Sequence, residues 1–352
     1  MSFWQAFRPA GRSVVLCIAV AGAGCNPSRG PDLTLQPEQF NTPDPSPASP
    51  DPTCLPQGQA VVLVGEQAGA RLLAVDAEHI YWTTSSGLNA ATETIWKLAK
   101  TGGEPSAVVR DVASLGFIAA HDGDLYWSLS AAGQIYRLPR GAVAAQLVSS
   151  LGRPTQLAVN GHGIYWLDSS AGTVMRANTD GSAAAPVAEG QRGLVQLQLD
   201  DSNVFWMNNE GHKVLAYSVM KAPLAGGPVT SIFGDQSYAQ GFAIDAEHVY
   251  ITTMNQLLRV GKDGTGLRLI ATEESVTGAP AVDSTRVYWT VSTPGGPSSV
   301  MSAPKSDSTP ATLAAGLTFP VAVAADLTSV YWLTKGDSRS GFTNGALTRL
   351  CK

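Results

Sequence analysis

Residues 72–83 read LLAVDAEHIYWT, and variants of this phrase occur seven times along the chain of 352 residues. Each copy has an apolar stretch, a short turn, and then Ile, Val or Leu followed by an aromatic residue. The copies are centred on Tyr81-Trp82, Tyr126-Trp127, Tyr165-Trp166, Phe205-Trp206, Tyr250-Ile251, Tyr288-Trp289 and Tyr331-Trp332. They lie 38 to 45 residues apart. A period of this length is typical of the blades of a β-propeller.

Each copy reads as four short strands, named a to d in chain order. In the first copy strand a is 72–75, strand b holds Tyr81-Trp82, strand c holds 95–97 and strand d holds 108–109. Six copies have Asp or Asn five residues before the aromatic residue. Their side chains suit the a-to-b turn because they accept hydrogen bonds from backbone N–H groups two residues on. We interpret them as turn formers rather than metal ligands.

Two further side chains recur in the copies. We interpret the Trp residues of strand b as core, because wide aromatic side chains suit the wedge-shaped space between blades better than an exposed carbohydrate site. The third residue of strand c is basic in six of seven copies, as in Lys97 and Arg349. We interpret these basic residues as solvated, with their aliphatic stems packed on the outer part of a blade.

The ends of the chain predict how the array closes. The seventh copy stops at Lys352, directly after its strand c, while Ala60–Val64 reads as a strand d without a copy of its own. An open sheet edge invites aggregation, and pairing the two ends removes it. We predict an all-β, seven-bladed β-propeller over residues 54–352, with the N-terminal strand closing the last blade, and we expect a monomer.

Four cysteines bear on the same closure. Cys54 precedes the leading strand and Cys351 follows the last strand c, so the closure places them within disulfide reach. Cys17 falls in an apolar run from Ser13 to Ala23 that follows Arg8 and Arg12. Such a run is too short to span a bilayer and is typical of a signal peptide, which we assign to residues 1–24. We predict export and a Cys54–Cys351 disulfide.

Residues Ala21 to Cys25 resemble a bacterial lipobox, in which the cysteine becomes the lipidated first residue of the mature protein. The sequence departs from that pattern at Gly22, where Leu is usual. Asn26 lacks the Asp that retains lipoproteins at the inner membrane, so the resemblance implies the outer membrane, with a periplasmic or secreted soluble protein as the alternative. Residues 25–53 thus hold the anchoring cysteine and a linker with eight prolines, which we expect to be an extended tether.

The aromatic pair is followed by Thr or Ser in Tyr81-Trp82-Thr83, Tyr126-Trp127-Ser128 and Tyr288-Trp289-Thr290. This phrase resembles the YWTD repeat of β-propellers. The receptor-type members have six blades, whereas this chain has seven copies. It is closer to uncharacterised propeller lipoproteins of Gram-negative bacteria, which implies a propeller at the cell envelope, held to the membrane by a lipid anchor only.

Composition and motifs limit the chemistry. The formal net charge is −5, so no basic surface points to nucleic acid. The sequence contains no HExxH, CxxC or GxSxG motif, so we assign no catalytic residue and no metal ligand. We expect no cofactor, except that a calcium ion bound by loop carboxylates is an alternative. The chemical alternative is a metal-dependent propeller lyase or hydrolase acting on a small molecule, similar to the streptogramin-inactivating type, whose His pattern is not found.

Binding residues are expected on the d-to-a and b-to-c loops, which share one face around the central channel of a propeller. These loops differ most in length between copies. Polar and aromatic residues near the channel mouth are Arg153, Arg192, Gln196, Tyr238 and Gln240. We therefore predict a non-catalytic binding or assembly scaffold at the cell envelope, whose partner is a protein, a peptide or a glycan.

Overall fold

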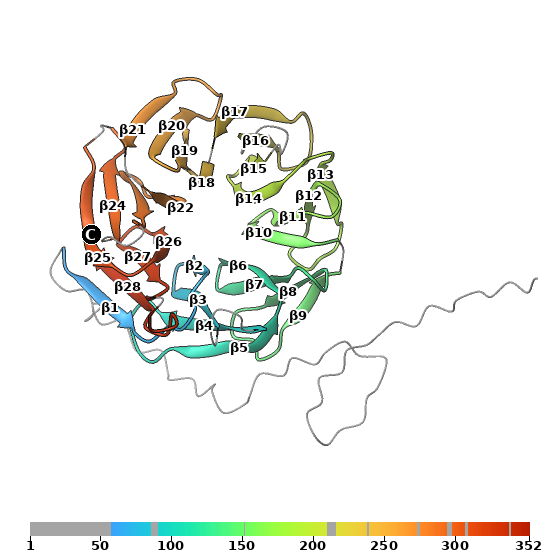
Figure 1. The fold of residues 1–352 in the computed structure, drawn as a ribbon. Coiled ribbons are helices and arrows are strands. Elements are labelled where there is room, and N and C mark those ends of the chain that lie inside the picture. Colours follow the sequence, from blue (N-terminus) through green and yellow to red (C-terminus); the bar gives the residue numbers. More distant parts are fainter. Residues whose placement is uncertain are drawn as a thin grey trace, which may run out of the picture.

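A computed structural model describes residues 58–85, 91–150, 152–209, 216–237, 239–272, 275–293, 298–306, 309–337 and 339–352. These residues form seven four-stranded antiparallel sheets arranged around a central axis (Figure 1). The prediction of an all-β, seven-bladed propeller is confirmed. Among the described residues, none belongs to a helix that could cross a membrane. The predicted signal peptide, Cys25 and the Pro-rich linker lie outside them.

From the centre outwards, blades 1 to 3 consist of β2 (Leu73–Val75), β3 (His79–Ser85), β4 (Thr92–Ala99) and β5 (Ser106–Ala113); β6 (Leu115–His121), β7 (Asp124–Leu129), β8 (Gln134–Leu138) and β9 (Gln146–Ser149); and β10 (Pro154–Asn160), β11 (Gly163–Asp168), β12 (Thr173–Ala177) and β13 (Ala185–Ala188). Blades 4 and 5 consist of β14 (Leu194–Leu199), β15 (Asn203–Asn209), β16 (Ala216–Pro223) and β17 (Thr230–Ser237); and β18 (Ala239–Ile244), β19 (His248–Thr253), β20 (Gln256–Gly261) and β21 (Arg268–Thr272). Blades 6 and 7 consist of β22 (Val276–Val282), β23 (Arg286–Val291), β24 (Ser298–Pro304) and β25 (Ala311–Leu317); and β26 (Pro320–Ala325), β27 (Ser329–Thr334), β28 (Ala346–Cys351) and β1 (Ala60–Val64).

The last blade takes its outer strand from the other end of the chain. β1 pairs antiparallel with β28, with Ala60 opposite Leu350 and Val62 opposite Thr348. Figure 1 shows β1, in blue, beside the red strands of blade 7. The predicted closure by the N-terminal strand is therefore present. Cys351 is disulfide-bonded, whereas Cys54 lies outside the described residues, so the Cys54–Cys351 pairing stays a prediction.

The core lies between the blades, in the interfaces that we call seams. Buried hydrophobic side chains of the described residues form seven clusters, and each cluster joins two neighbouring blades. In six of them the aromatic residue that opens the pair in one blade meets the Trp of the next, as Tyr165 of blade 3 meets Trp206 of blade 4. The six strand-b Trp side chains are fully buried. Their interpretation as core is confirmed.

The a-to-b turn also binds the next blade. Asp245 accepts hydrogen bonds from the backbone N–H groups of Glu247 and His248 through Oδ1, at 2.9 and 2.8 Å. Its Oδ2 accepts from the hydroxyl of Tyr250 at 3.0 Å and lies 2.7 Å from Nζ of Lys305, which belongs to blade 6. The Lys305 ammonium also lies 5.6 Å from the centre of the Tyr250 ring. One carboxylate thus shapes its turn and joins two blades.

The same arrangement, called here the seam ion pair, recurs in three more seams. Its members are Asp200–Lys262, Asp245–Lys305, Asp283–Lys352 and Asp326–Lys100. The basic residue of strand c makes a second bond across the seam. In blade 7, Arg349 donates to the backbone oxygen of Lys100 at 2.7 Å. Arg259 and Lys221 do the same to Lys305 and Lys262, both at 2.6 Å. The interpretation of these residues as solvated is wrong, and Arg349 is only 2% exposed.

We expect Lys305→Met to lower the free energy of unfolding by about 2 kcal/mol, because it leaves the half-buried Asp245 carboxylate without its cation. Arg140→Met is the matched control, since Arg140 holds the same position in blade 2 but pairs with Glu78 at the surface. The control should cost well under about 1 kcal/mol. Urea denaturation followed by tryptophan fluorescence measures both, and equal costs would contradict a structural role for the seam ion pair.

The seam ion pair also predicts acid sensitivity. Burial alone would raise the pKa of Asp245, but the bonds from Lys305 and from two backbone N–H groups outweigh burial and lower the pKa to about 2. The folded pKa is below the unfolded value of about 3.9, so this contribution to stability is present above about pH 4 and is lost as the pH falls towards 2. The urea midpoint should fall over that range, and it should fall less in Lys305→Met than in the unchanged protein. Parallel curves would disprove the assignment.

Candidate binding face

The innermost strands stand around the central axis (Figure 1). Most of them contribute to the wall of a central channel with a volume of about 550 Å³. The wall is made by residues from β6, β10, β14, β18, β22 and β26, with two from β15 and β16. Its polar side chains are four amides and one phenol: Gln156, Gln196, Gln198, Gln240 and Tyr217. The remaining lining is apolar, and none of the described lining residues carries a charge. Such a wall suits an uncharged ligand that exchanges hydrogen bonds.

Two of these amides hold neighbouring blades together. Gln196 on β14 donates through Nε2 to the backbone oxygen of Phe242 at 2.7 Å and accepts from the Phe242 N–H at 2.8 Å. Gln198 donates to the same oxygen at 2.8 Å and accepts from the N–H of Ile244 at 3.1 Å. A Gln side chain has both a donor and an acceptor, so it pairs with β18 as a backbone amide would. Gln196, predicted as a binding residue, therefore has both amide groups engaged within the fold.

The equivalent amide of the preceding blade behaves differently. Gln156 stands nine residues before its aromatic residue, as Gln196 does. Its Oε1 is nevertheless buried without a hydrogen bond from any described residue. Gln240, from β18, is exposed and lines the channel, and none of the described residues bonds its side chain. The two predicted residues Gln196 and Gln240 thus meet in one channel wall, but only Gln240 presents a free amide.

The two predicted arginines lie on the d-to-a loops and are exposed. Arg153 is positioned by its backbone, because its N–H donates to Oδ1 of Asp168 at 3.0 Å. Burial would raise the pKa of Asp168, but the bonds from Ser170, Arg153 and Ala171 lower it, so the carboxylate stays charged and holds the loop. Neither arginine lines the channel, so the structure places them on the surrounding face. Tyr238 lies outside the described residues.

The same face carries an aromatic pair that was not predicted from the sequence. Phe319, on the d-to-a loop of blade 7, is 47% exposed and packs edge-on against Phe342 of the b-to-c loop, with ring centres 6.0 Å apart. The ammonium of Lys335 lies 4.8 Å from the centre of the Phe342 ring. Both phenylalanines have positive φ, +50° for Phe319 and +62° for Phe342. A bulky residue in that region is strained, which is most often tolerated at functional positions.

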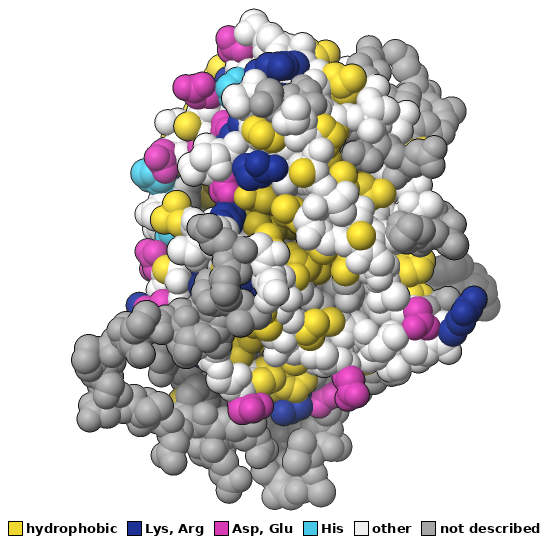
Figure 2. Space-filling model, turned by 90° about the vertical axis from the view of Figure 1, so that its left-hand side faces the viewer, with side chains coloured by type: hydrophobic (Ala, Val, Ile, Leu, Met, Phe, Trp, Pro, Cys, Tyr) yellow, Lys and Arg dark blue, Asp and Glu magenta, His cyan; other side chains and the backbone are white. Residues whose placement is uncertain are grey.

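The opposite face carries the a-to-b turns and most of the charge. The described histidines, His79, His121, His162 and His248, all lie in or beside these turns, far from the loops of the candidate face. In Figure 2, the visible histidine side chains and several acidic ones lie towards the left edge of the molecule. Within the described ranges no group of three or more His, Cys, Asp or Glu could hold a metal ion. His79 and His248 lie beside Asp76 and Asp245, the carboxylates of their own turns.

Comparisons with known proteins support the fold. No family model matches the chain, and no curated protein matches it in sequence. Among solved structures, a nidogen/laminin complex matches at 15% identity with a TM-score of 0.51, covering 70% of this chain and 93% of that one. Virginiamycin B lyase from Staphylococcus aureus matches at 12% identity and a TM-score of 0.61, covering 83% and 98%. A puromycin-hydrolysing peptidase from Mycobacterium tuberculosis matches at 12% and 0.62, covering 80% and 52%.

Identities this low show a shared fold and nothing finer. The YWTD-like repeat propeller inferred from the sequence agrees with these matches and with the seven blades. The three structures include a complex and two enzymes, so the fold alone does not separate a binding protein from an enzyme. The kinship to bacterial lipoproteins stays a prediction.

The structural role of Gln196 and the free side chain of Gln240 predict different effects on the free energy of unfolding. Gln196→Ala removes two hydrogen bonds to the backbone of Phe242, so we expect the free energy of unfolding to fall by about 1 to 2 kcal/mol. Gln240→Ala removes an exposed side chain without a bond, so its effect should stay within about 0.5 kcal/mol. Urea denaturation of the two variants tests this, and a cost at Gln240 equal to that at Gln196 would contradict the division of roles.

Proposed function

We propose that this chain is a non-catalytic binding or assembly protein of the cell envelope, which contacts a protein, peptide or glycan through the face that carries the d-to-a and b-to-c loops. The observation that carries the proposal is the channel of about 550 Å³, lined by amide, phenol and apolar groups without a charge. Peptide backbones and sugars offer the uncharged donors and acceptors that such a wall can pair with.

The rim of the channel supports the same function. Arg153 and Arg192 offer exposed side chains, and Phe319 with Phe342 offers a partly exposed aromatic surface. Aromatic residues and arginine are enriched where proteins bind partners, because they bury large areas or form several hydrogen bonds. A rigid ring that presents these groups on loops is a usual arrangement for recognition.

The anchoring part of the proposal rests on residues 1–53. Lipidation of Cys25 would hold the chain to the outer membrane, while the 28 residues from Asn26 to Thr53 form the tether. At about 3.1 Å per residue, a fully extended polyproline chain of that length reaches about 85 Å. The candidate face could then meet a partner well away from the anchoring leaflet. Without lipidation, the same protein would be periplasmic or secreted.

A second candidate is a metal-dependent lyase or hydrolase acting on a small molecule. Two structural neighbours favour it. Their names, virginiamycin B lyase and puromycin-hydrolysing peptidase, describe enzymes that act on small molecules. A calcium ion bound by loop carboxylates would fit either candidate. The channel wall among the described residues has no group that serves as an acid or base near neutral pH. We therefore favour the binding protein.

The test is capture of partners from an envelope extract by the processed chain, followed by mass spectrometry. Changing Arg153, Arg192 and Gln240 to Ala should abolish the recovered set. The matched control changes Arg140, Arg268 and His162, three exposed residues of the opposite face, to Ala.

Recovery of the same partners by the unchanged chain and by the first variant would refute the proposed face. Loss of partners in the control as well would show that unspecific charge explains the capture. A saturable turnover of a small molecule that a chelator abolishes would favour the enzyme instead.

A further inference from the structure

The seam between blades 1 and 2 lacks the ion pair found in four other seams. Arg140 stands where Lys100, Lys262, Lys305 and Lys352 stand in their blades. Its guanidinium pairs with Glu78 at 2.5 Å, and both side chains are largely exposed. Asp76 therefore keeps its two backbone N–H donors and the Tyr81 hydroxyl, but has no lysine from the next blade. The basic residue of blade 2 thus crosses this seam to Glu78 at the surface, and not to the buried Asp76.

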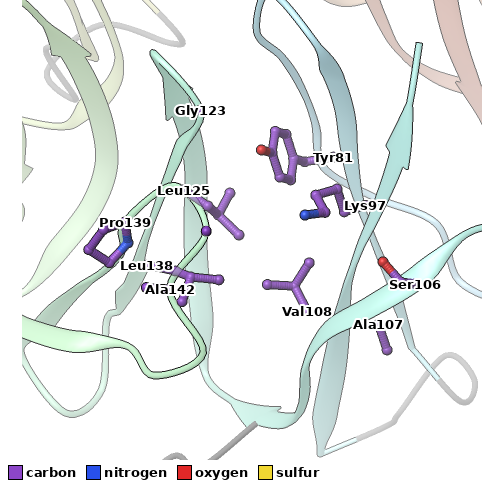
Figure 3. A pocket seen from close by; sticks show the side chains of 11 residues that line it. Tyr81, Lys97, Ser106, Ala107, Val108, Gly123, Leu125, Leu138, Pro139 and Ala142 are labelled. Carbon is purple, nitrogen blue, oxygen red and sulfur yellow. The ribbon is translucent and has the colours of Figure 1, made fainter. Parts of the chain in front are cut away.

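A cavity of about 130 Å³ occupies this seam (Figure 3). Blade 1 contributes Tyr81, Lys97, Ser106 and Val108, and blade 2 contributes Leu125 and Leu138. Figure 3 shows the ammonium of Lys97 and the side chains of Val108 and Leu125 directed into the space between the two blades. Its wall is therefore apolar except for one ammonium, one phenol and one hydroxyl.

Lys97 differs from the basic residues that hold the equivalent position in strand c of other blades. Its counterparts Arg349, Arg259 and Lys221 each donate to a backbone oxygen of the next blade, at 2.6 to 2.7 Å. Lys97 stands at the same place in strand c, yet its ammonium makes no hydrogen bond or ion pair with any described residue. Lys97 is half-buried, and its ammonium is free to donate a charge-assisted hydrogen bond to an anion that enters the cavity.

The acidic groups around the cavity are bonded within the fold, Asp124 and Glu78 to arginines and Asp76 to neutral donors. Oδ2 of Asp124 lies 2.6 Å from Arg137, and Glu78 is paired with Arg140. Asp76 is only 3% exposed and points its Oδ1 at the N–H groups of Glu78 and His79. Burial lowers the pKa of His79, and the charge of Lys97 lowers it further, so His79 adds no second cation near neutral pH. Lys97 is therefore the one charged residue among the described residues that line the cavity.

We propose that this seam cavity binds a short-chain monocarboxylate, with its carboxylate on Lys97 and its alkyl chain against Val108, Leu125 and Leu138. One ammonium matches one carboxylate, while a dianion would stay half-neutralised in an apolar wall. The size also fits, because a cavity of about 150 Å³ in another protein holds benzene, a molecule of six non-hydrogen atoms. Butyrate has the same number of non-hydrogen atoms. This site is independent of the channel and of the proposed partner.

Calorimetric titration of the processed chain with butyrate tests the site. We expect saturable binding of one butyrate per chain, and at least tenfold weaker binding of butan-1-ol and of butylammonium, which have the same alkyl chain without a negative charge. Decanoate should bind more weakly than butyrate because its chain exceeds the cavity.

Lys97→Met should weaken butyrate binding at least tenfold without destabilising the fold, since the ammonium has no bond to lose, and Lys97→Arg should retain it. Lys221→Met is the matched control, because it removes the equivalent cation from blade 4 and should leave butyrate binding unchanged. Equal binding by the unchanged chain and Lys97→Met would overturn the proposal. Tighter binding of decanoate, or binding of butylammonium instead of butyrate, would overturn it as well.

Discussion

The width of the seams between blades is the constraint on which the rest of the structure depends. Neighbouring residues of a strand point to opposite faces of its sheet, so the aromatic pair on strand b fills both seams that its blade borders. Blade 5 shows how the space is conserved when the pair changes. Ile251 stands where Trp is usual, and its cluster contains Phe233 and Phe242 in addition to Phe205, which holds the position of Tyr in the other seams. The motif is therefore a solution to a packing problem, and the volume of the seam matters more than the identity of one residue.

The sequence predicted the blades because period and alternation are local signals, and it predicted the closure because a strand was missing at one end and present at the other. The seam ion pairs were missed because each joins residues of different repeats, such as Lys262 with Asp200. Nothing within one repeat shows which way a lysine side chain turns. Arg349, Arg259 and Lys221 of strand c were misinterpreted for the same reason. A polar residue reads as solvated when its bonding partner lies in the next blade.

The candidate face was predicted in part. Loop position and unequal loop length indicated one side of the ring as the candidate face, but residue type did not separate structural amides from free ones. Gln156, Gln196 and Gln240 look alike in the sequence, and only the geometry of β14 against β18 shows that Gln196 is engaged. Phe319 and Phe342 were missed because their exposure and positive φ are properties of the backbone, which an aromatic residue in a loop does not reveal.

The pairing of β1 with β28 also sets the order of folding. Blades 1 to 6 each contain strands that are close in the chain, so they can form while later residues are still being synthesised. Val61 and Arg349 face each other across nearly the whole chain, which makes the last blade the contact of highest sequence separation. Such contacts form slowly, because a long loop must close first. β1, the first described strand, therefore pairs only after β28, the last one, has formed. Until then blades 1 and 7 both expose surfaces that are later buried, and a chaperone could bind them.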